Sequence, residues 1–155
     1  MALPNLPQDF ADLLTEFASA RVRYLVIGGY AVGFHDRPRA TKDLDILLAD
    51  TEDNVENACR ALTAFGAPPA IIEGLRNAAH DEIVWFGMPP ERVDLLKSAA
   101  GLEFEAAYAR RAEMTLDSGS ISIVGIDDLI TMKRAADRDQ DRVDVKRLER
   151  ARSRA

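Results

Sequence analysis

Three aspartates in strand-like contexts, Asp43, Asp45 and Asp94, are the residues whose types and spacing could do chemistry. Because side chains alternate across a β-strand, Asp43 and Asp45 project from one side, while Leu44 and Ile46 project from the other. Two carboxylates on one face of a half-buried strand repel each other and lose hydration unless cations neutralise them. Divalent ions with oxygen ligands do this, so the spacing predicts a site for Mg²⁺ or Mn²⁺.

Asp94 supplies a third carboxylate in the same kind of context, because its neighbours in the run Val93–Leu96 face the core while it faces outward. Three such carboxylates can hold two ions. Two ions about 3.5 to 4 Å apart stabilise both the attacking and the leaving oxygen of an in-line displacement. We therefore predict that Asp43, Asp45 and Asp94 are the catalytic residues and the metal ligands of a two-metal phosphoryl-transfer site.

A glycine pair, Gly28 and Gly29, follows the short β-branched run Tyr24–Ile27. A strand that ends in glycines and leads into a helix presents backbone N–H groups and the helix dipole to a phosphate. The same pair is also typical of an ordinary turn. We predict that Gly28 and Gly29 bind the phosphates of a nucleotide.

Four basic residues could bind the same anion. Lys133 falls four positions after Leu129, on or beside the helical stripe that should face the core, where an ammonium group needs an anionic partner. The alternative is that the aliphatic part of the Lys133 side chain is buried while its ammonium group reaches the solvent. Arg37, Arg39 and Lys42 precede the aspartates and could contact a triphosphate or an acceptor, or could simply solvate a loop. We assign Lys133 and Lys42 to nucleotide binding.

Length and composition predict one domain over residues 1–155. The chain is 47% apolar and 30% charged, as in ordinary globular proteins. It contains no apolar run long enough for a membrane span and no secretion signal, so we expect a cytoplasmic protein without a membrane partner. The one cysteine, Cys59, excludes an internal disulfide and is expected to be a buried thiol.

The charge distribution is uneven. The net charge of −6 argues against a broad nucleic-acid-coating surface. Residues 133–155 nevertheless carry nine basic and five acidic side chains, a net +4. This segment is either a local anion-binding face or a solvated helix face with i,i+4 ion pairs.

Hydrophobic periodicity predicts alternating helices and strands. Helices are expected over 8–20, 30–35 and 52–65, around Phe104, and over a C-terminal helical segment 126–151 that bends. Strands are expected over 24–27, 43–48, 83–86, 92–96, 114–116 and 121–124, the last four as two hairpins, while 69–81 is ambiguous. Trp85 and Phe86 are expected in the core, and His35 in a structural role. The pattern favours an α+β fold with a mixed β-sheet flanked by helices.

The glycine motif in Val26–Val32, the aspartates in Arg39–Ile46 and the run Ile126–Lys133 together resemble the DNA polymerase beta-like nucleotidyltransferases, in particular the small AbiEii-type toxin–antitoxin nucleotidyltransferases. The resemblance implies a nucleotidyltransferase (polymerase beta palm-like) fold with C-terminal helices. It also implies that Lys133 contacts the phosphates of the nucleotide. Relatives commonly have a serine where this chain has Gly29, so backbone donors would replace a hydroxyl there.

The resemblance further implies a Mg²⁺-dependent enzyme that transfers a nucleoside monophosphate from an NTP to an acceptor hydroxyl. A tRNA is the first expected acceptor, in a toxin–antitoxin setting with a cognate antitoxin or toxin as partner. Two alternatives are a non-catalytic nucleotide-binding or antitoxin-like interaction module and nucleotidyl transfer to a partner protein. An antibiotic-modifying enzyme ranks last, because we expect it to need a larger acceptor domain than 155 residues provide.

Overall fold

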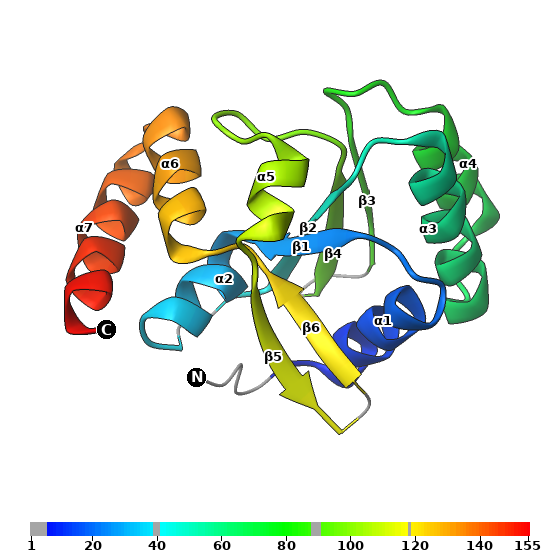
Figure 1. The fold of residues 1–155 in the computed structure, drawn as a ribbon. Coiled ribbons are helices and arrows are strands. Elements are labelled where there is room, and N and C mark those ends of the chain that lie inside the picture. The colour runs from blue at the N-terminus through cyan, green and yellow to red at the C-terminus, as the bar shows by residue number, and fades with distance from the viewer. Residues whose placement is uncertain (1–5, 39–40, 88–90, 118) are drawn as a thin grey trace.

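The computed structural model describes residues 6–38, 41–87, 91–117 and 119–155, which form one mixed sheet and seven helices (Figure 1). The strands are β1 (Tyr24–Ile27), β2 (Asp43–Leu48), β3 (Ile83–Phe86), β4 (Arg92–Leu96), β5 (Ala112–Leu116) and β6 (Gly119–Ile123). The helices are α1 (Gln8–Ser19), α2 (Gly28–His35), α3 (Glu52–Phe65), α4 (Pro69–Asn77), α5 (Phe104–Ala109), α6 (Ile126–Ala136) and α7 (Asp139–Arg154).

The six strands lie in the order β3-β4-β2-β1-β6-β5. The two predicted hairpins are confirmed, because β3 pairs antiparallel with β4 and β5 antiparallel with β6. Strand β2 pairs antiparallel with β1 and parallel with β4, and β1 pairs parallel with β6. The α+β class with a mixed sheet is therefore confirmed. Residues 88–90 and 118, on which the hairpin turns were partly predicted, lie outside the described residues.

The helices divide between two sides of the sheet. Figure 1 shows α1, α3 and α4 grouped at one side and α2, α6 and α7 at the other. The apolar face of α1 is buried as its periodicity predicts, with Leu13 and Phe17 fully inaccessible to solvent. Helix α3 begins where the Thr51 hydroxyl accepts a hydrogen bond from the Asn54 N–H, and it ends at Gly66, whose φ is +96°. These caps fix both ends of α3, and α4 follows before the chain returns to the sheet at β3.

Helix α7 is anchored to the end of α2 by a buried carboxylate. Asp36, whose side chain is 5% exposed, accepts hydrogen bonds from Arg147 at 2.8 Å and Arg154 at 2.9 Å. A charge buried to this degree is costly unless it is paired, so the two guanidinium groups fix α7 against α2.

Three helices differ from their predicted extents. The ambiguous segment 69–81 contains α4, whose first residue, Pro69, is favoured at this position. Helix α2 begins two residues early, at Gly28. The C-terminal segment consists of two helices, separated at Asp137, which has the left-handed φ of 52°. None of the helices in the described part of the chain combines the length and the apolar composition needed to cross a bilayer.

The prediction that Trp85 packs in the core is wrong, whereas that for Phe86 is confirmed. Phe86 is 9% exposed and Trp85 is 52% exposed. Successive residues of a strand face opposite sides of the sheet, so both rings could be buried only if β3 were covered on both faces. Strand β3 lies at the edge of the sheet, and the face that carries Trp85 is open.

His35 and Cys59 have the structural surroundings that the sequence predicts. Nε2 of His35 lies 2.7 Å from the carbonyl oxygen of Val124, and burial lowers the pKa of the imidazole. The Cys59 thiol is buried in the core, and burial raises its pKa. Neither group lies in the cavity described below.

Candidate functional site

Strand pairing places Asp45 beside Asp94. The parallel register of β2 and β4 pairs these two residues directly, and the antiparallel register of β1 and β2 pairs Asp45 with Ile27. Directly paired residues project to the same face of a sheet, with their Cβ atoms about 4.5 to 5.5 Å apart. Besides burial, Asp94 raises the pKa of Asp45 through its hydrogen bonding and charge, as expected for neighbouring carboxyl groups. Two residues far apart in the sequence thus form one acidic pair.

Asp43 lies on the same strand face, one row along, where it pairs with Arg92. Its side chain is exposed, and the three predicted ligands do not form one cluster: within the described ranges, no group of three or more His, Cys, Asp or Glu side chains is arranged to hold a metal ion. Asp94 is already engaged, because its Oδ1 accepts a hydrogen bond from Arg92 Nε at 2.6 Å. A cation held by all three carboxylates would require Arg92 to release Asp94 and Asp43 to turn inward.

The cations near Asp45 and Asp94 do not fully neutralise this acidic pair. Burial, followed by the hydrogen bond and charge of Asp94 and the charge of Asp43, raises the pKa of Asp45 to about 7, against the opposing effect of Lys133. Asp45 therefore keeps its proton to a much higher pH than an ordinary carboxyl group does. Carboxylate oxygens are the donors that hard divalent cations prefer, so the pair fits a Mg²⁺ or Mn²⁺ ion in place of that proton.

Gly28 lies directly against the acidic pair. Its φ is +70°, and a Cβ atom added to it would lie 2.2 Å from Asp45 Oδ2. Both the backbone conformation and the available space therefore require glycine. Helix α2 begins here, with Gly29 in its first turn, and the first N–H groups of a helix have no partner within the helix. This end of α2 can bind an anion beside the carboxylates.

A cavity of about 260 Å³ connects these elements with the C-terminal helices. The sheet side contributes Gly28, Asp45 and Asp94, and the α6–α7 side contributes Lys133 and Arg138, along with other lining residues. The carboxylates of Asp45 and Asp94 thus share the cavity with the cations of the α6–α7 side, where Asp141 also contributes to the lining. A triphosphate with a bound divalent cation has the complementary charge distribution.

The other predicted nucleotide-binding residues are not among those that line the cavity. Lys42 and Arg37 are exposed, and Arg39 lies outside the described residues. Gly29 is also absent from the lining, although its neighbour Gly28 is part of it.

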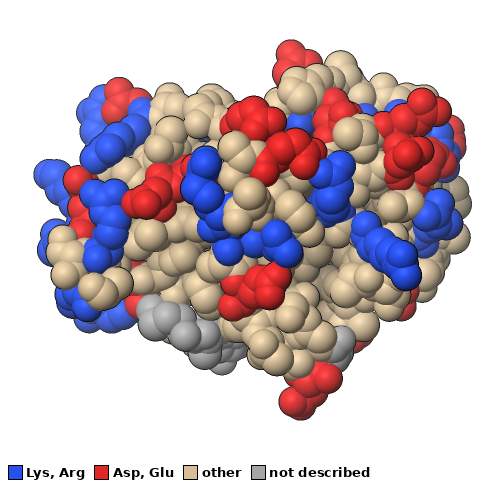
Figure 2. Space-filling model, viewed as in Figure 1, with Lys and Arg blue, Asp and Glu red and all other residues tan. Residues whose placement is uncertain are grey.

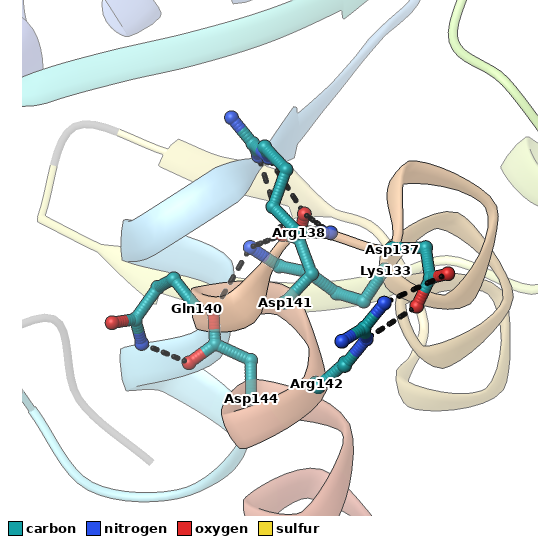
Figure 3. Close-up of polar contacts among 7 residues, drawn as sticks. All are labelled: Lys133, Asp137, Arg138, Gln140, Asp141, Arg142 and Asp144. Carbon is teal, nitrogen blue, oxygen red and sulfur yellow. Dashed lines mark hydrogen bonds and ion pairs between the residues drawn. The ribbon is translucent and has the colours of Figure 1, made fainter.

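Lys133 is held in place by two buried carboxylates of α7 (Figure 3). Its Nζ lies 3.3 Å from Asp141 Oδ1 and 3.0 Å from Asp144 Oδ2. The lysine side chain is 12% exposed and the two aspartates at most 1%. An ammonium group has three donors, so one donor remains for an anion in the cavity. The lysine thus has the anionic partners that its position on the helix requires.

Asp141 also organises the junction between α6 and α7. It accepts hydrogen bonds from the backbone N–H of Arg138 at 3.1 Å and from Arg138 Nε at 2.7 Å, which caps the start of α7. The Arg138 side chain, with smaller contributions from the Arg138 backbone and from Lys133, lowers the pKa of Asp141 to about 2 despite its burial. The carboxylate therefore stays ionised and keeps both cations at the cavity wall.

Sequence reasoning missed the contact between Arg92 and the acidic pair. The guanidinium carbon of Arg92 lies 4.5 Å from the centre of the Trp85 ring, while Nε binds Asp94. The sequence did contain a signal for this contact. Residues two positions apart on a strand share a face, and Arg92 precedes Asp94 by two positions. The exposed position of Trp85 follows from the same alternation, which the sequence interpretation did not apply to β3.

The mixed sheet with its flanking helices is a nucleotidyltransferase fold. The solved structure that shows this is the lincosamide antibiotic adenylyltransferase LnuA, determined with bound lincomycin. It aligns at a TM-score of 0.55 and 15% sequence identity over 92% of this chain and 95% of that chain. At this identity the similarity shows the fold alone. No protein-family model and no curated protein matches the chain, so the AbiEii-type subfamily stays a prediction.

The expectation that an antibiotic-modifying nucleotidyltransferase needs a larger chain is wrong. The alignment covers nearly all of both chains, so the LnuA chain has a similar length. An adenylyltransferase of this fold can therefore take a small-molecule acceptor without an additional large domain.

We predict that Gly28→Ala disrupts the site beyond its effect on the backbone. The new methyl group would displace the Asp45 carboxylate, and divalent-ion binding should weaken at least tenfold in a Mn²⁺ titration followed by electron paramagnetic resonance. Gly66→Ala is the matched control, because Gly66 also has a positive φ but has no atom within 4 Å of an added Cβ. That variant should lose about 1 kcal/mol of stability and bind Mn²⁺ normally. Equal Mn²⁺ affinity in both variants would contradict the role of Gly28.

The raised pKa of Asp45 predicts how the stability of the metal-free protein depends on pH. The ordinary pKa is 3.8 and the folded value about 7, so the folded state binds the extra proton between these limits. The contribution of this group to the free energy of unfolding should therefore be fully present below pH 3.8 and be lost as the pH rises through about 7. Asp45→Asn should flatten this decline in urea titrations, whereas Asp117→Asn, at the exposed β5–β6 turn, should not.

Lys133 should have separable structural and binding roles. Lys133→Met leaves the buried Asp144 without its ammonium partner and should cost about 3 kcal/mol in urea unfolding. The double variant Lys133→Met/Asp144→Asn should recover most of that stability but still bind Mg²⁺–NTP at least tenfold more weakly than wild type. If the double variant regains nucleotide affinity together with stability, the lysine acts only on the fold.

Proposed function

We propose that the protein is a nucleotidyltransferase that moves a nucleoside monophosphate from an NTP to a hydroxyl group. The observation that carries this proposal is the paired placement of Asp45 and Asp94 beside Gly28, in a cavity whose opposite wall carries Lys133. The nucleotidyltransferase fold supports the same activity. In LnuA the fold belongs to an adenylyltransferase, which makes ATP the first NTP to test.

The proposed reaction is an in-line displacement at the α-phosphorus. The acceptor oxygen forms a new bond to phosphorus, the bond from phosphorus to the α–β bridging oxygen breaks, and that electron pair leaves with pyrophosphate. The hydroxyl proton is taken up by the adjacent carboxylate pair and then released to solvent. We assign this proton uptake to Asp94, which pairs directly with Asp45.

The residues of the cavity would divide the remaining tasks. Asp45 and Asp94, with Asp43 after it turns inward, would hold Mg²⁺ or Mn²⁺, which supplies charge neutralisation and Lewis acidity when bound. The start of α2 at Gly28 and Gly29 would bind the β and γ phosphates through backbone N–H groups. Lys133 would stabilise the charge that develops on pyrophosphate, and exposed Lys42 would reach the nucleotide from outside the cavity.

The C-terminal basic segment gives limited support to a tRNA acceptor. Figure 2 shows lysine and arginine side chains gathered over α6 and α7, with acidic side chains among them. Many of these cations are paired: Arg134 with Glu149, Arg142 with Asp137, and Arg152 with Asp127. Phosphate binding by such residues would have to break these pairs. This pairing favours the solvated helix face, so tRNA stays a prediction from the resemblance.

The finer expectations from the resemblance also stay predictions. These are the toxin–antitoxin setting with a cognate partner, transfer to a partner protein, the cytoplasmic location, and a single nucleotidyltransferase domain over 1–155 with its helical segment 126–151. The competing class, a non-catalytic nucleotide-binding or antitoxin-like module, would bind Mg²⁺–NTP without releasing pyrophosphate. The retained acidic pair supports turnover, because a purely structural role would not need two adjoining carboxyl groups, of which Asp45 has a raised pKa.

Asp45→Asn should abolish nucleotide transfer while the fold stays intact. The amide removes one negative charge from the predicted metal site, and transfer should fall at least a hundredfold. The measurement is incorporation of α-³²P-labelled nucleotide, in the presence of Mg²⁺, into total tRNA, into protein and into hydroxylated small molecules including lincomycin. Asp117→Asn is the control and should transfer normally, and circular dichroism checks the fold.

Unchanged transfer by Asp45→Asn would refute the assigned roles. Mg²⁺-dependent NTP binding in wild type without pyrophosphate release, across all four NTPs and all three acceptor classes, would favour the non-catalytic module instead.

A further inference from the structure

Two large apolar side chains stand exposed beside the acidic pair. Ile83 is 56% exposed and Trp85 52% exposed, both on edge strand β3. They are two residues apart, so they share one face of the sheet. The register pairs Trp85 directly with Asp94, which places this apolar face next to the carboxylates. Among the described residues the remaining large exposed hydrophobic side chain is Val143, on α7.

These side chains border an open groove of about 770 Å³ between α4 and β3. Ile71 and Gly74 contribute from α4, and Ile83 and Trp85 from β3. Ile83 also lines the catalytic cavity, so the groove and the cavity are adjacent. Helix α4 packs toward Val84, on the face of β3 opposite to Ile83 and Trp85, so a molecule in the groove would reach the acidic pair by extending around this edge strand.

The charge of the groove restricts what it can bind. Among the described residues that line it, Glu82 is the only charged one, and its carboxylate accepts a hydrogen bond from the backbone N–H of Ala79 at 2.6 Å. Polyanions such as RNA are bound through lysine and arginine contacts to phosphates, which this lining does not provide. A concave, mostly apolar surface with few polar groups is typical of small-molecule sites.

Arg92 keeps the Trp85 ring oriented at the border between groove and cavity. Its guanidinium group lies over the ring and binds Asp94 at the same time. A planar or apolar group that packs on Ile83 and Trp85 would thus lie one strand spacing from Asp94. This is the distance over which a hydroxyl substituent can reach the carboxylate oxygens.

We propose that the groove between α4 and β3 is the acceptor subsite, and that its occupant is a small hydroxylated molecule with an apolar face and no negative charge. Ile83 and Trp85 bind the apolar face and direct a hydroxyl toward Asp94. The inference rests on the proposed nucleotidyl transfer for its purpose, but the binding itself can be measured without turnover.

The test is a titration of the ¹⁵N-labelled protein, followed by amide chemical shifts, with a panel of uncharged alkyl and aryl β-glucosides. Their 6-phosphorylated counterparts and an RNA oligonucleotide ending in CCA are titrated in parallel. We expect at least one uncharged glucoside to shift the amides of Gly74 and Ile83. Trp85→Ala and Ile83→Ser should weaken this binding about tenfold, Trp85→Phe should weaken it less, and Val143→Ala, the matched exposed control, should leave it unchanged.

Several outcomes overturn the proposal: no glucoside shifts the groove amides, the phosphorylated compounds or the RNA bind there more tightly, or Val143→Ala weakens binding as much as Trp85→Ala. Mg²⁺–ATP affinity, measured on the two Trp85 variants and on Val143→Ala, should not change, because these residues do not line the catalytic cavity. If wild type fails to bind Mg²⁺–ATP while the glucoside results hold, the proposed nucleotidyl transfer fails and the groove remains a small-molecule site.

Discussion

The parallel pairing of β2 with β4 imposes the constraint around which the rest of the site is arranged, because it forces the carboxyl groups of Asp45 and Asp94 together. Like charges at this separation repel, and burial adds to the cost, so Asp45 keeps its proton to a much higher pH than an ordinary carboxyl group does. Arg92 on one side and Lys133 on the other lie near the pair but are themselves shared with other groups. A cation bound between the carboxyl groups, as proposed above, would offset this repulsion.

The site walls that surround this pair differ in how they are stabilised. The sheet side depends on backbone geometry, since Gly28 can approach Asp45 only without a side chain. The α6–α7 side depends on buried charge, since Lys133 and Arg138 are held by Asp141. Substitutions on the first wall therefore change the shape of the cavity, whereas substitutions on the second change its charge and the stability of the helix junction together.

Local patterns were sufficient to predict most of the fold. Strand β2 has the predicted bounds, because the buried residues at alternate positions and the carboxylates between them leave no other periodicity. The position of Lys133 on its helix correctly indicated a need for anionic partners. Contacts between strands that are distant in the sequence could not be predicted from local patterns. The pairing of Asp45 with Asp94 and of Asp43 with Arg92 depends on how β4 aligns beside β2. A bend in the C-terminal segment was predicted, but its position at Asp137 was not, because a non-glycine residue adopts the left-handed conformation there.

The ion pairs of Asp36 with Arg147 and Arg154 connect the C-terminal end of the chain to the site. They do so although neither arginine lines the cavity. Asp36 closes the helix that starts at Gly28, and the two arginines belong to the helix that positions Lys133 through Asp144. The start of α2 at Gly28 and the cavity wall at Lys133 are therefore held in a fixed arrangement by the same ion pairs. The entropy cost of ordering them is met when the chain folds, so the cavity would be preorganised for the nucleotide that we propose it binds.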